Sequence, residues 1–133
     1  MTSKIQCLMR VGGVAAALLV GTGCAPVDVE GTWVGTWRAA LWSDDGGMTL
    51  DLSQDGDEVT GNFDLTGTAC VGSGRVDGAV DRRKFDVSLY NGVGGEIVLD
   101  GNVNAASDKI DGDFVVTGGL CDGARGTFKV DLQ

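Results

Sequence analysis

Regular alternation of apolar and polar side chains, from Gly31 almost to the end of the chain, is the feature that most constrains the fold. Apolar residues recur at i, i+2 and i+4, and Gly, Asp or Asn repeatedly interrupts the pattern. Successive side chains of a strand point to opposite faces, so this period predicts strands, and no helical period of any length accompanies it. The chain is therefore expected to be all-β.

Eight strands are predicted, separated by turns that contain suitable residues. The strands cover residues 31–40, 47–54, 58–66, 71–80, 83–90, 95–103, 109–117 and 124–132. The turns contain Asp44 to Gly47, Asp55 to Asp57, Asn91-Gly92 and Asp122-Gly123, which tolerate positive φ. Short consecutive connections predict a meander of antiparallel neighbours, which suits one small up-and-down barrel.

The predicted sheet has one apolar face and one acidic face. The apolar face collects Trp33, Trp37, Met48, Leu50, Leu52, Val59, Phe63, Leu65, Val76, Val80, Phe85, Val87, Leu89, Ile97, Leu99, Val103, Ile110, Phe114, Val116, Phe128, Val130 and Leu132. Such a sheet must close on itself or stack on a second sheet, and closure also removes edge strands. We therefore expect an eight-stranded antiparallel meander barrel over residues 31–133.

The segment from Val59 to Cys70 returns 51 positions later as Ile110 to Cys121. The copies match at Gly61 and Gly112, Phe63 and Phe114, Thr66 and Thr117, Gly67 and Gly118, Cys70 and Cys121, and Gly72 and Gly123. This repeat predicts internal duplication as two four-stranded halves. Glycines also recur on the inward face, where they either bend the strands or hollow out a cavity. Bending is favoured because large inward side chains can fill an eight-stranded barrel.

The first 23 residues have the organisation of an export signal. Lys4 and Arg10 precede an apolar run from Val11 to Val20, and Gly21 to Gly23 supply small residues before Cys24. The alternative is a transmembrane helix, but that requires roughly 20 apolar residues. Residues 1–23 are therefore predicted to be a signal peptide, followed by a tether over residues 24–30.

The sequence Val20 to Cys24 resembles the lipobox of bacterial lipoproteins, although the family usually has Leu, Val or Ile where Gly21 stands. The resemblance implies lipid transfer to Cys24, cleavage before it, and anchoring in the membrane of a bacterial cell envelope. Ala25 follows the cysteine where an aspartate would favour the inner membrane, which implies the outer membrane in a Gram-negative cell. Cleavage after Ala25 is the competing possibility, and Pro26 disfavours it.

The remaining cysteines, Cys70 and Cys121, are expected to form a disulfide in an oxidising compartment, because Cys7 leaves with the signal and Cys24 takes the lipid. Two buried free thiols are the alternative. Of the ten basic residues two lie in the leader, while all 19 acids follow it, so the mature chain has a net charge of −11. That charge disfavours nucleic acid and anionic membrane surfaces as partners.

Gly31-Thr32-Trp33 is similar to the opening of lipocalins, and Val59 to Phe63 looks like a strand of avidins. Both families have calycin-type barrels that bind small ligands at the mouth. The lipocalin resemblance implies that Arg125 covers Trp33 at one end of the barrel. In avidins the biotin pocket contains tryptophans from several strands, whereas Trp33, Trp37 and Trp42 all lie on or beside the first strand here. Biotin binding is therefore not inferred.

An enzyme is not expected from this sequence, which contains no histidine. The two cysteines of the domain are expected to be oxidised, and the paired carboxylates lie in turns or on the solvated face. Calcium at Asp55 to Glu58 is the one metal site considered, and an ordinary Asp-Gly turn is favoured there. The sequence therefore predicts no catalytic residues, metal or cofactor.

Two functions of different classes remain. The first is a lipocalin-like module that binds a small apolar ligand in the barrel mouth, with candidate residues Trp33, Trp37, Phe63, Phe114 and Arg125. The second is a structural or protein-interaction lipoprotein with a solidly packed barrel. An exposed Trp42 would favour the interaction protein, and a void between Trp37, Phe63 and Phe114 would favour the ligand. Binding is preferred because small barrels often use the mouth.

Overall fold

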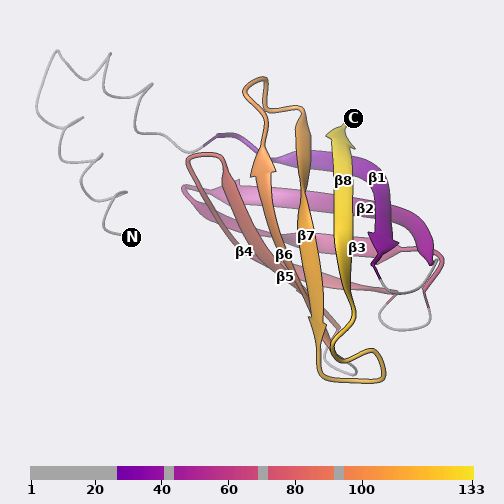
Figure 1. Cartoon of the computed structure of the whole chain (residues 1–133). Helices are drawn as coiled ribbons and strands as arrows, with labels where there is room; N and C mark the ends of the chain where they lie inside the picture. Colours follow the sequence, from indigo (N-terminus) through magenta and orange to yellow (C-terminus); the bar gives the residue numbers. More distant parts are fainter. Residues whose placement is uncertain (1–26, 41–43, 69–71, 92–94) are drawn as a thin grey trace, which may run out of the picture.

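The computed structural model describes residues 27–40, 44–68, 72–91 and 95–133, and they form an eight-stranded barrel (Figure 1). The strands are β1 (Gly31–Ala39), β2 (Asp45–Asp55), β3 (Glu58–Leu65), β4 (Ser73–Asp81), β5 (Lys84–Tyr90), β6 (Glu96–Val103), β7 (Lys109–Thr117) and β8 (Arg125–Leu132). Each strand pairs antiparallel with the next, and β8 pairs with β1 to close the barrel. The all-β, up-and-down meander barrel predicted from the sequence is confirmed.

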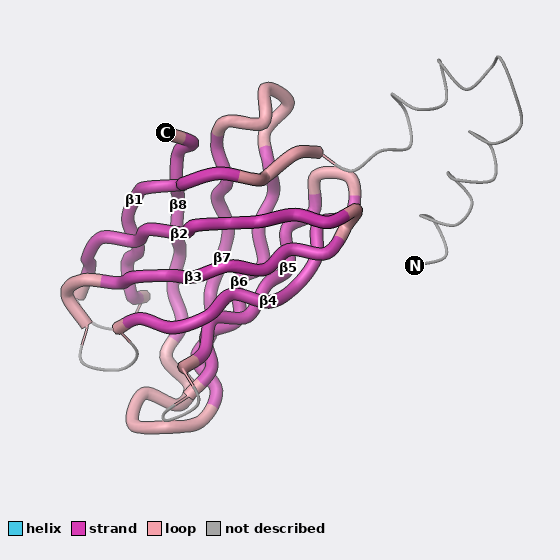
Figure 2. Tube along the Cα trace, turned by 180° about the vertical axis from the view of Figure 1, so that it is seen from behind, coloured by secondary structure: helices cyan, strands magenta, loops and turns pink. Residues whose placement is uncertain are grey.

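The strands on opposite sides of the barrel run at a steep angle to one another. Figures 1 and 2 show β1 to β3 crossing behind or in front of β6 to β8, depending on the side from which the molecule is seen. This crossing follows from the strong tilt that strands need to close a small barrel. The interior is consequently narrow and can be filled by side chains.

Strand boundaries differ from the prediction mainly at β2 and β4. β2 begins at Asp45 instead of residue 47, because Asp45 and Gly46 pair with Arg38 and Trp37 at the end of β1. The segment expected to be wholly turn is thus partly strand. The next turn agrees with expectation, since Asp55 pairs with Glu58 across two residues.

Side chains predicted to face inward form the core. All of them are buried except Leu65, which is half-buried against the core, and Leu132, which lies at the end of β8 and is 38% exposed. Trp33, Phe85 and Leu99 are fully enclosed. Among the described residues no polar or charged side chain is buried. Most of the barrel interior is therefore a dry, packed core.

The repeated glycines Gly61 and Gly112 occupy equivalent places on β3 and β7. A Cβ atom at Gly61 would collide with the backbone carbonyl of Asp51 on β2, and one at Gly112 would collide with that of Asp100 on β6. Each glycine therefore permits two strands to approach closely, as expected for glycines that help the sheet to curve. The sequence repeat has a structural counterpart in this pair of contacts.

The residues just before β1 lie across one end of the barrel. The backbone N–H of Val27 donates to the carbonyl of Arg82 at 3.1 Å, and that of Val29 donates to Oε1 of Gln54 at 2.7 Å. Val29 is fully buried, and its carbonyl accepts a hydrogen bond from Nε1 of Trp33 at 2.9 Å. Residues 27–30 were expected to belong to an extended tether, whereas they cover this end, here called the closed end.

The opposite end of the barrel, here called the mouth, carries the connections from each odd-numbered strand to the following even-numbered one. The turns after β2, β4 and β6 lie at the closed end, where the N–H of Leu132 also donates to the carbonyl of Asp108 at 2.8 Å. Within the described residues, no helix has the length and apolar character needed to cross a membrane.

Candidate functional site: the barrel mouth

A cavity of about 370 Å³ opens at the mouth, between the ends of several strands. Its described apolar lining consists of Trp37, Met48, Leu65, Ile97, Phe114, Val116, Cys121 and Ala124. Its described polar lining consists of Asp44 and Thr68. Small-molecule sites usually have volumes of about 300–1,000 Å³ and a mainly apolar lining with few polar groups. The cavity therefore has the size and character of a site for a small ligand.

Two aromatic rings define one wall of the cavity. The ring centroids of Trp37 and Phe114 lie 6.2 Å apart, with an angle of 84° between the ring planes. This edge-to-face arrangement is a favourable geometry for aromatic pairs. Nε1 of Trp37 donates to the carbonyl of Thr66 at 3.0 Å, which fixes the orientation of the indole. The aromatic wall is thus held in place without a ligand.

The β7–β8 connection brings further residues to the rim. The N–H of Gly118 donates to Oδ1 of Asp122 at 2.7 Å, and that of Ala124 donates to the carbonyl of Cys121 at 2.9 Å. These bonds order a tight loop, and they place Cys121 and Ala124 at the cavity. On the other side, the carbonyl of Asp44 accepts the N–H of Ala39 at 2.9 Å and so fixes the backbone at the start of β2.

The structure places the five ligand-binding residues predicted from the sequence in different parts of the barrel. Trp37 and Phe114 line the cavity, whereas the binding hypothesis expected a void between these two rings and Phe63. Phe63 is buried in the core and is absent from the described lining. Trp33 is also buried, but at the closed end, where it bonds to Val29.

Arg125 does not cover Trp33, so the arrangement implied by the lipocalin resemblance is wrong for this chain. Arg125 is exposed at the beginning of β8, where it pairs with Val115 near the mouth. Trp33 pairs with Leu132 at the other end of the same strand. Positions 125 and 132 are seven steps apart along the chain, a span of roughly 23 Å along an extended strand. The closed end is covered by Val29 instead.

Several lining residues were not assigned to the site from the sequence. Met48, Ile97 and Val116 were predicted to face inward, but nothing indicated that they lie beside a cavity. Their closeness to the odd-to-even connections is the signal that could have identified them. Asp44 was treated only as a turn residue, and its place on the rim depends on the length of β1 and β2.

The predicted signal peptide over residues 1–23 lies outside the described residues. The same is true of Cys24, Cys70 and Trp42. Cys121, the expected partner of Cys70, is half-buried and packs against the core. The disulfide and the lipid attachment therefore stay predictions.

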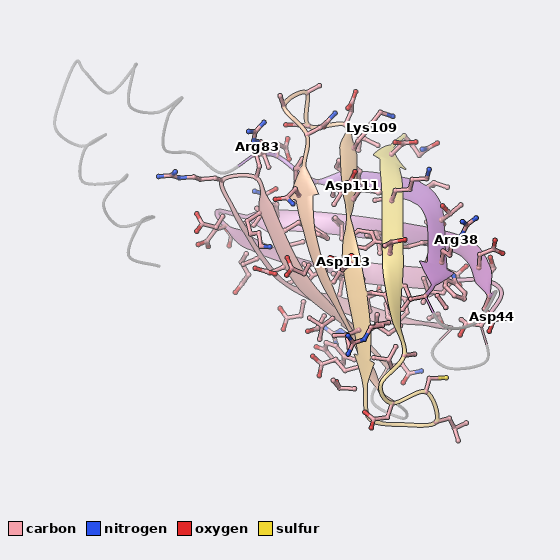
Figure 3. The ribbon with its side chains drawn as sticks, in the orientation of Figure 1. Arg38, Asp44, Arg83, Lys109, Asp111 and Asp113 are labelled. Atoms are coloured by element: carbon pink, nitrogen blue, oxygen red, sulfur yellow. The ribbon has the colours of Figure 1, made fainter. Side chains whose placement is uncertain are left out.

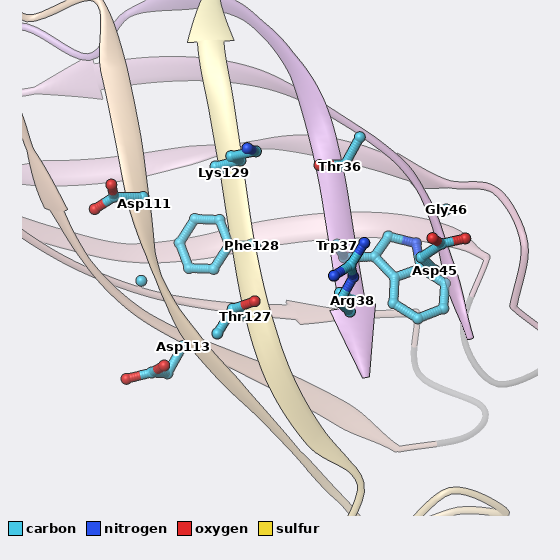
Figure 4. A pocket seen from close by; sticks show the side chains of 11 residues that line it. Thr36, Trp37, Arg38, Asp45, Gly46, Asp111, Asp113, Thr127, Phe128 and Lys129 are labelled. Carbon is cyan, nitrogen blue, oxygen red and sulfur yellow. The ribbon is translucent and has the colours of Figure 1, made fainter. Parts of the chain in front are cut away.

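A second hollow of about 840 Å³ lies where the outer faces of β7, β8 and β1 meet (Figure 4). Its charged lining includes Arg38, Lys129, Asp111 and Asp113, so both signs are present. Figure 3 shows Arg38, Asp111 and Asp113 on the outer side of the barrel. This groove is open and mixed in polarity, and it does not select one class of ligand.

Elsewhere on the outer face, two lysines bond to carboxylates across strands. Lys84 bonds to Asp100, and Nζ of Lys109 lies 3.0 Å from Oδ1 of Asp131. These hydrogen bonds raise the pKa of each lysine above its ordinary value. All four side chains are well exposed, so the pairs add little to stability.

No group of three or more potential metal-ligating residues occurs in the described part of the chain.

In comparisons with known proteins, no family model matches this sequence, and no curated protein is significantly similar to it.

Proposed function

We propose that the protein is a lipoprotein of the bacterial cell envelope whose barrel binds a small apolar molecule in its mouth. The observation that carries this proposal is the cavity of about 370 Å³ beside Trp37 and Phe114. The other inward side chains of the described strands are mostly buried in one core, and the cavity lies at one end of it. For a ligand-binding module the sequence predicts a void between Trp37, Phe63 and Phe114, and two of these three rings line the cavity.

The proposed anchor is the lipid on Cys24, in the outer membrane if the cell is Gram-negative. Residues 27–30 lie against the closed end, so only residues 24–26 separate the lipid from the barrel. Three extended residues span about 10 Å. The closed end would therefore sit next to the bilayer, and the mouth would face away from it.

A disulfide between Cys70 and Cys121 is part of the proposal. Cys121 lines the cavity on the β7–β8 connection, and Cys70 belongs to the connection between β3 and β4. A bridge between them would tie two connections together at the mouth. Such a bridge typically contributes about 2–4 kcal/mol to stability.

A second candidate function is protein interaction through the mouth. Leu120, on the β7–β8 connection, is 96% exposed. A large apolar side chain in that position could contact another envelope protein. One exposed leucine is nevertheless a smaller signal than a cavity with an ordered aromatic wall.

The direct test is native mass spectrometry of the chain from Ala25 to Gln133, which contains every strand of the barrel. The protein would be exported by its own host without the lipid-carrying cysteine, and its mass compared before and after extraction with organic solvent. We expect one apolar molecule per barrel, lost on extraction. A bare mass in every preparation would contradict ligand binding.

A pair of matched variants would place that molecule in the mouth. Ala124 is 7% exposed and lines the cavity, so Ala124→Leu adds bulk within it. Ala79→Leu makes the same change at an exposed position on the outer face of β4. We expect Ala124→Leu to lower ligand occupancy at least about tenfold and Ala79→Leu to leave it unchanged. Equal occupancy in the two variants would exclude the mouth as the site.

A further inference from the structure

The mouth cavity has a definite charge character. Asp44 is the one charged side chain in its described lining, and no lysine or arginine contributes to it. The charged part of the described lining is thus a single residue, and it is negative.

The hydrogen-bond donors of the lining are also unsuited to an anion. The indole N–H of Trp37 is occupied by the carbonyl of Thr66 at 3.0 Å. The only other described polar side chain of the lining besides Asp44 is Thr68. An anionic group such as a carboxylate is stable away from water only when donors or cations surround it. A fatty acid would thus bring a second negative charge to a lining whose one charged described residue is already negative.

A cation would find complementary groups in the same place. The π-electron faces of aromatic rings attract cations, and Trp37 and Phe114 are both in the lining. Asp44, an exposed residue of the lining, adds a negative charge that would complement the positive charge of a cation. Aromatic rings combined with a carboxylate can bind ammonium groups, while the aliphatic lining accepts an apolar body.

Basic residues near the mouth do not reverse this preference. Arg38 lines the outer groove and is absent from the described lining of the cavity. Arg125 is exposed at the beginning of β8 and is likewise absent from it. The mature chain as a whole has a net charge of −11, which attracts cations at long range.

We propose that the mouth binds a small apolar cation, a protonated amine or a quaternary ammonium compound, with its apolar body in the cavity and its positive group beside Asp44. This inference rests on the proposed ligand-binding function and names the class of ligand. Neutral apolar molecules of the same shape bind more weakly, and anionic ones bind most weakly.

Three probes that share one apolar cage test the charge preference. They are 1-aminoadamantane, which is protonated at pH 7, 1-adamantanol, which is neutral, and adamantane-1-carboxylate, which is an anion. Binding to the chain from Ala25 to Gln133 would be measured by isothermal titration calorimetry. We expect the ammonium probe to bind about tenfold or more tightly than the carboxylate, because one is attracted to Asp44 and the other repelled.

Asp44→Asn and Asp45→Asn form a matched pair, since they change neighbouring residues and each removes one negative charge. Asp44 lines the mouth cavity, whereas Asp45 lines the outer groove. We expect Asp44→Asn to reduce the preference for the ammonium probe to about threefold or less, and Asp45→Asn to retain most of it. If both variants keep the preference, or only Asp45→Asn loses it, the assignment to Asp44 is wrong.

The other outcomes separate this inference from the proposed function. Equal binding of all three probes would overturn the cation preference and leave an apolar site in the mouth. Tighter binding of the carboxylate probe than of the ammonium probe would also overturn the cation preference and leave an apolar site. Failure of all three probes to bind, together with a bare native mass, would overturn both proposals.

Discussion

Gly112 shows how a single residue sets the shape of the barrel. A side chain there would meet the backbone of β6 at Asp100, and backbone atoms cannot move aside as the end of a flexible side chain can. A side chain at Gly61 would likewise meet the backbone of β2 at Asp51. The repeated glycine is therefore required by close strand contact, and its lack of a side chain is the property that matters.

We expect Gly112→Ala to destabilise the protein by more than about 2 kcal/mol, because its Cβ must displace backbone. Gly72→Ala is the matched control, since a Cβ at Gly72 meets nothing within 4 Å. Its effect should stay within about 0.5 kcal/mol. Urea denaturation followed by tryptophan fluorescence would measure both. Similar stabilities for the two variants would contradict the close-contact role of Gly112.

The face of each residue could be predicted from the sequence, whereas its height along the barrel could not. Alternation assigned Trp33, Trp37, Phe63 and Phe114 to the interior, and the structure confirms this for all four. It could not show that Trp33 lies at the closed end and Trp37 at the mouth, because height depends on strand register. The role expected for Arg125 failed for that reason, since register places it beside Val115.

At the scale of structural elements, the segment from Val27 to Glu30 matters most for the site, because it covers the end of the barrel opposite the mouth. It bonds to Arg82 and Gln54 and buries Val29 against the closed end. These described residues thereby cover one end of the barrel. The proposed ligand would then enter its cavity from the mouth.

Val29→Ala should destabilise the protein by about 2 kcal/mol, because Val29 is fully buried and its removal leaves a small void. Val34→Ala makes the same change at a side chain that is 41% exposed on β1, and it should cost less than about 0.5 kcal/mol. Thermal unfolding monitored by circular dichroism would compare them. Equal melting temperatures would show that residues 27–30 do not stabilise the closed end.

The eight strands were predictable because periodicity and turn residues agree along most of the chain. The cover over the closed end was not predicted, although Val27 and Val29 alternate with Asp28 and Glu30 as strand residues do. Four residues are too few for a reliable strand signal, and their partners lie on distant turns. The same limit applies to the start of β2, where pairing with Trp37 extended the strand.

For the molecule as a whole, the proposed lipid anchor would give the barrel an orientation relative to the membrane. Lipid on Cys24 would hold the closed end near the bilayer, since residues 27–30 are fixed there. The mouth would then face the aqueous side. Access for a dissolved ligand follows from this orientation.

Energy transfer to a dye in the lipid headgroups would measure this orientation on vesicles that carry the lipidated protein. A donor would be attached through an azide-bearing residue at Ala106, on the turn at the closed end, or at Leu120, at the mouth. We expect transfer to be several-fold more efficient from position 106. More efficient transfer from position 120 would reverse the proposed orientation.

The most direct test of the central claim is to locate a bound probe by intermolecular nuclear Overhauser contacts in solution. Both 1-aminoadamantane and 1-adamantanol would be used, so that the result does not depend on charge. We predict contacts from the cage protons to Met48, Ile97, Phe114 and Val116, which line the mouth cavity. Contacts confined to Thr36, Thr127 and Lys129 in the outer groove, or no contacts from either probe, would contradict the account.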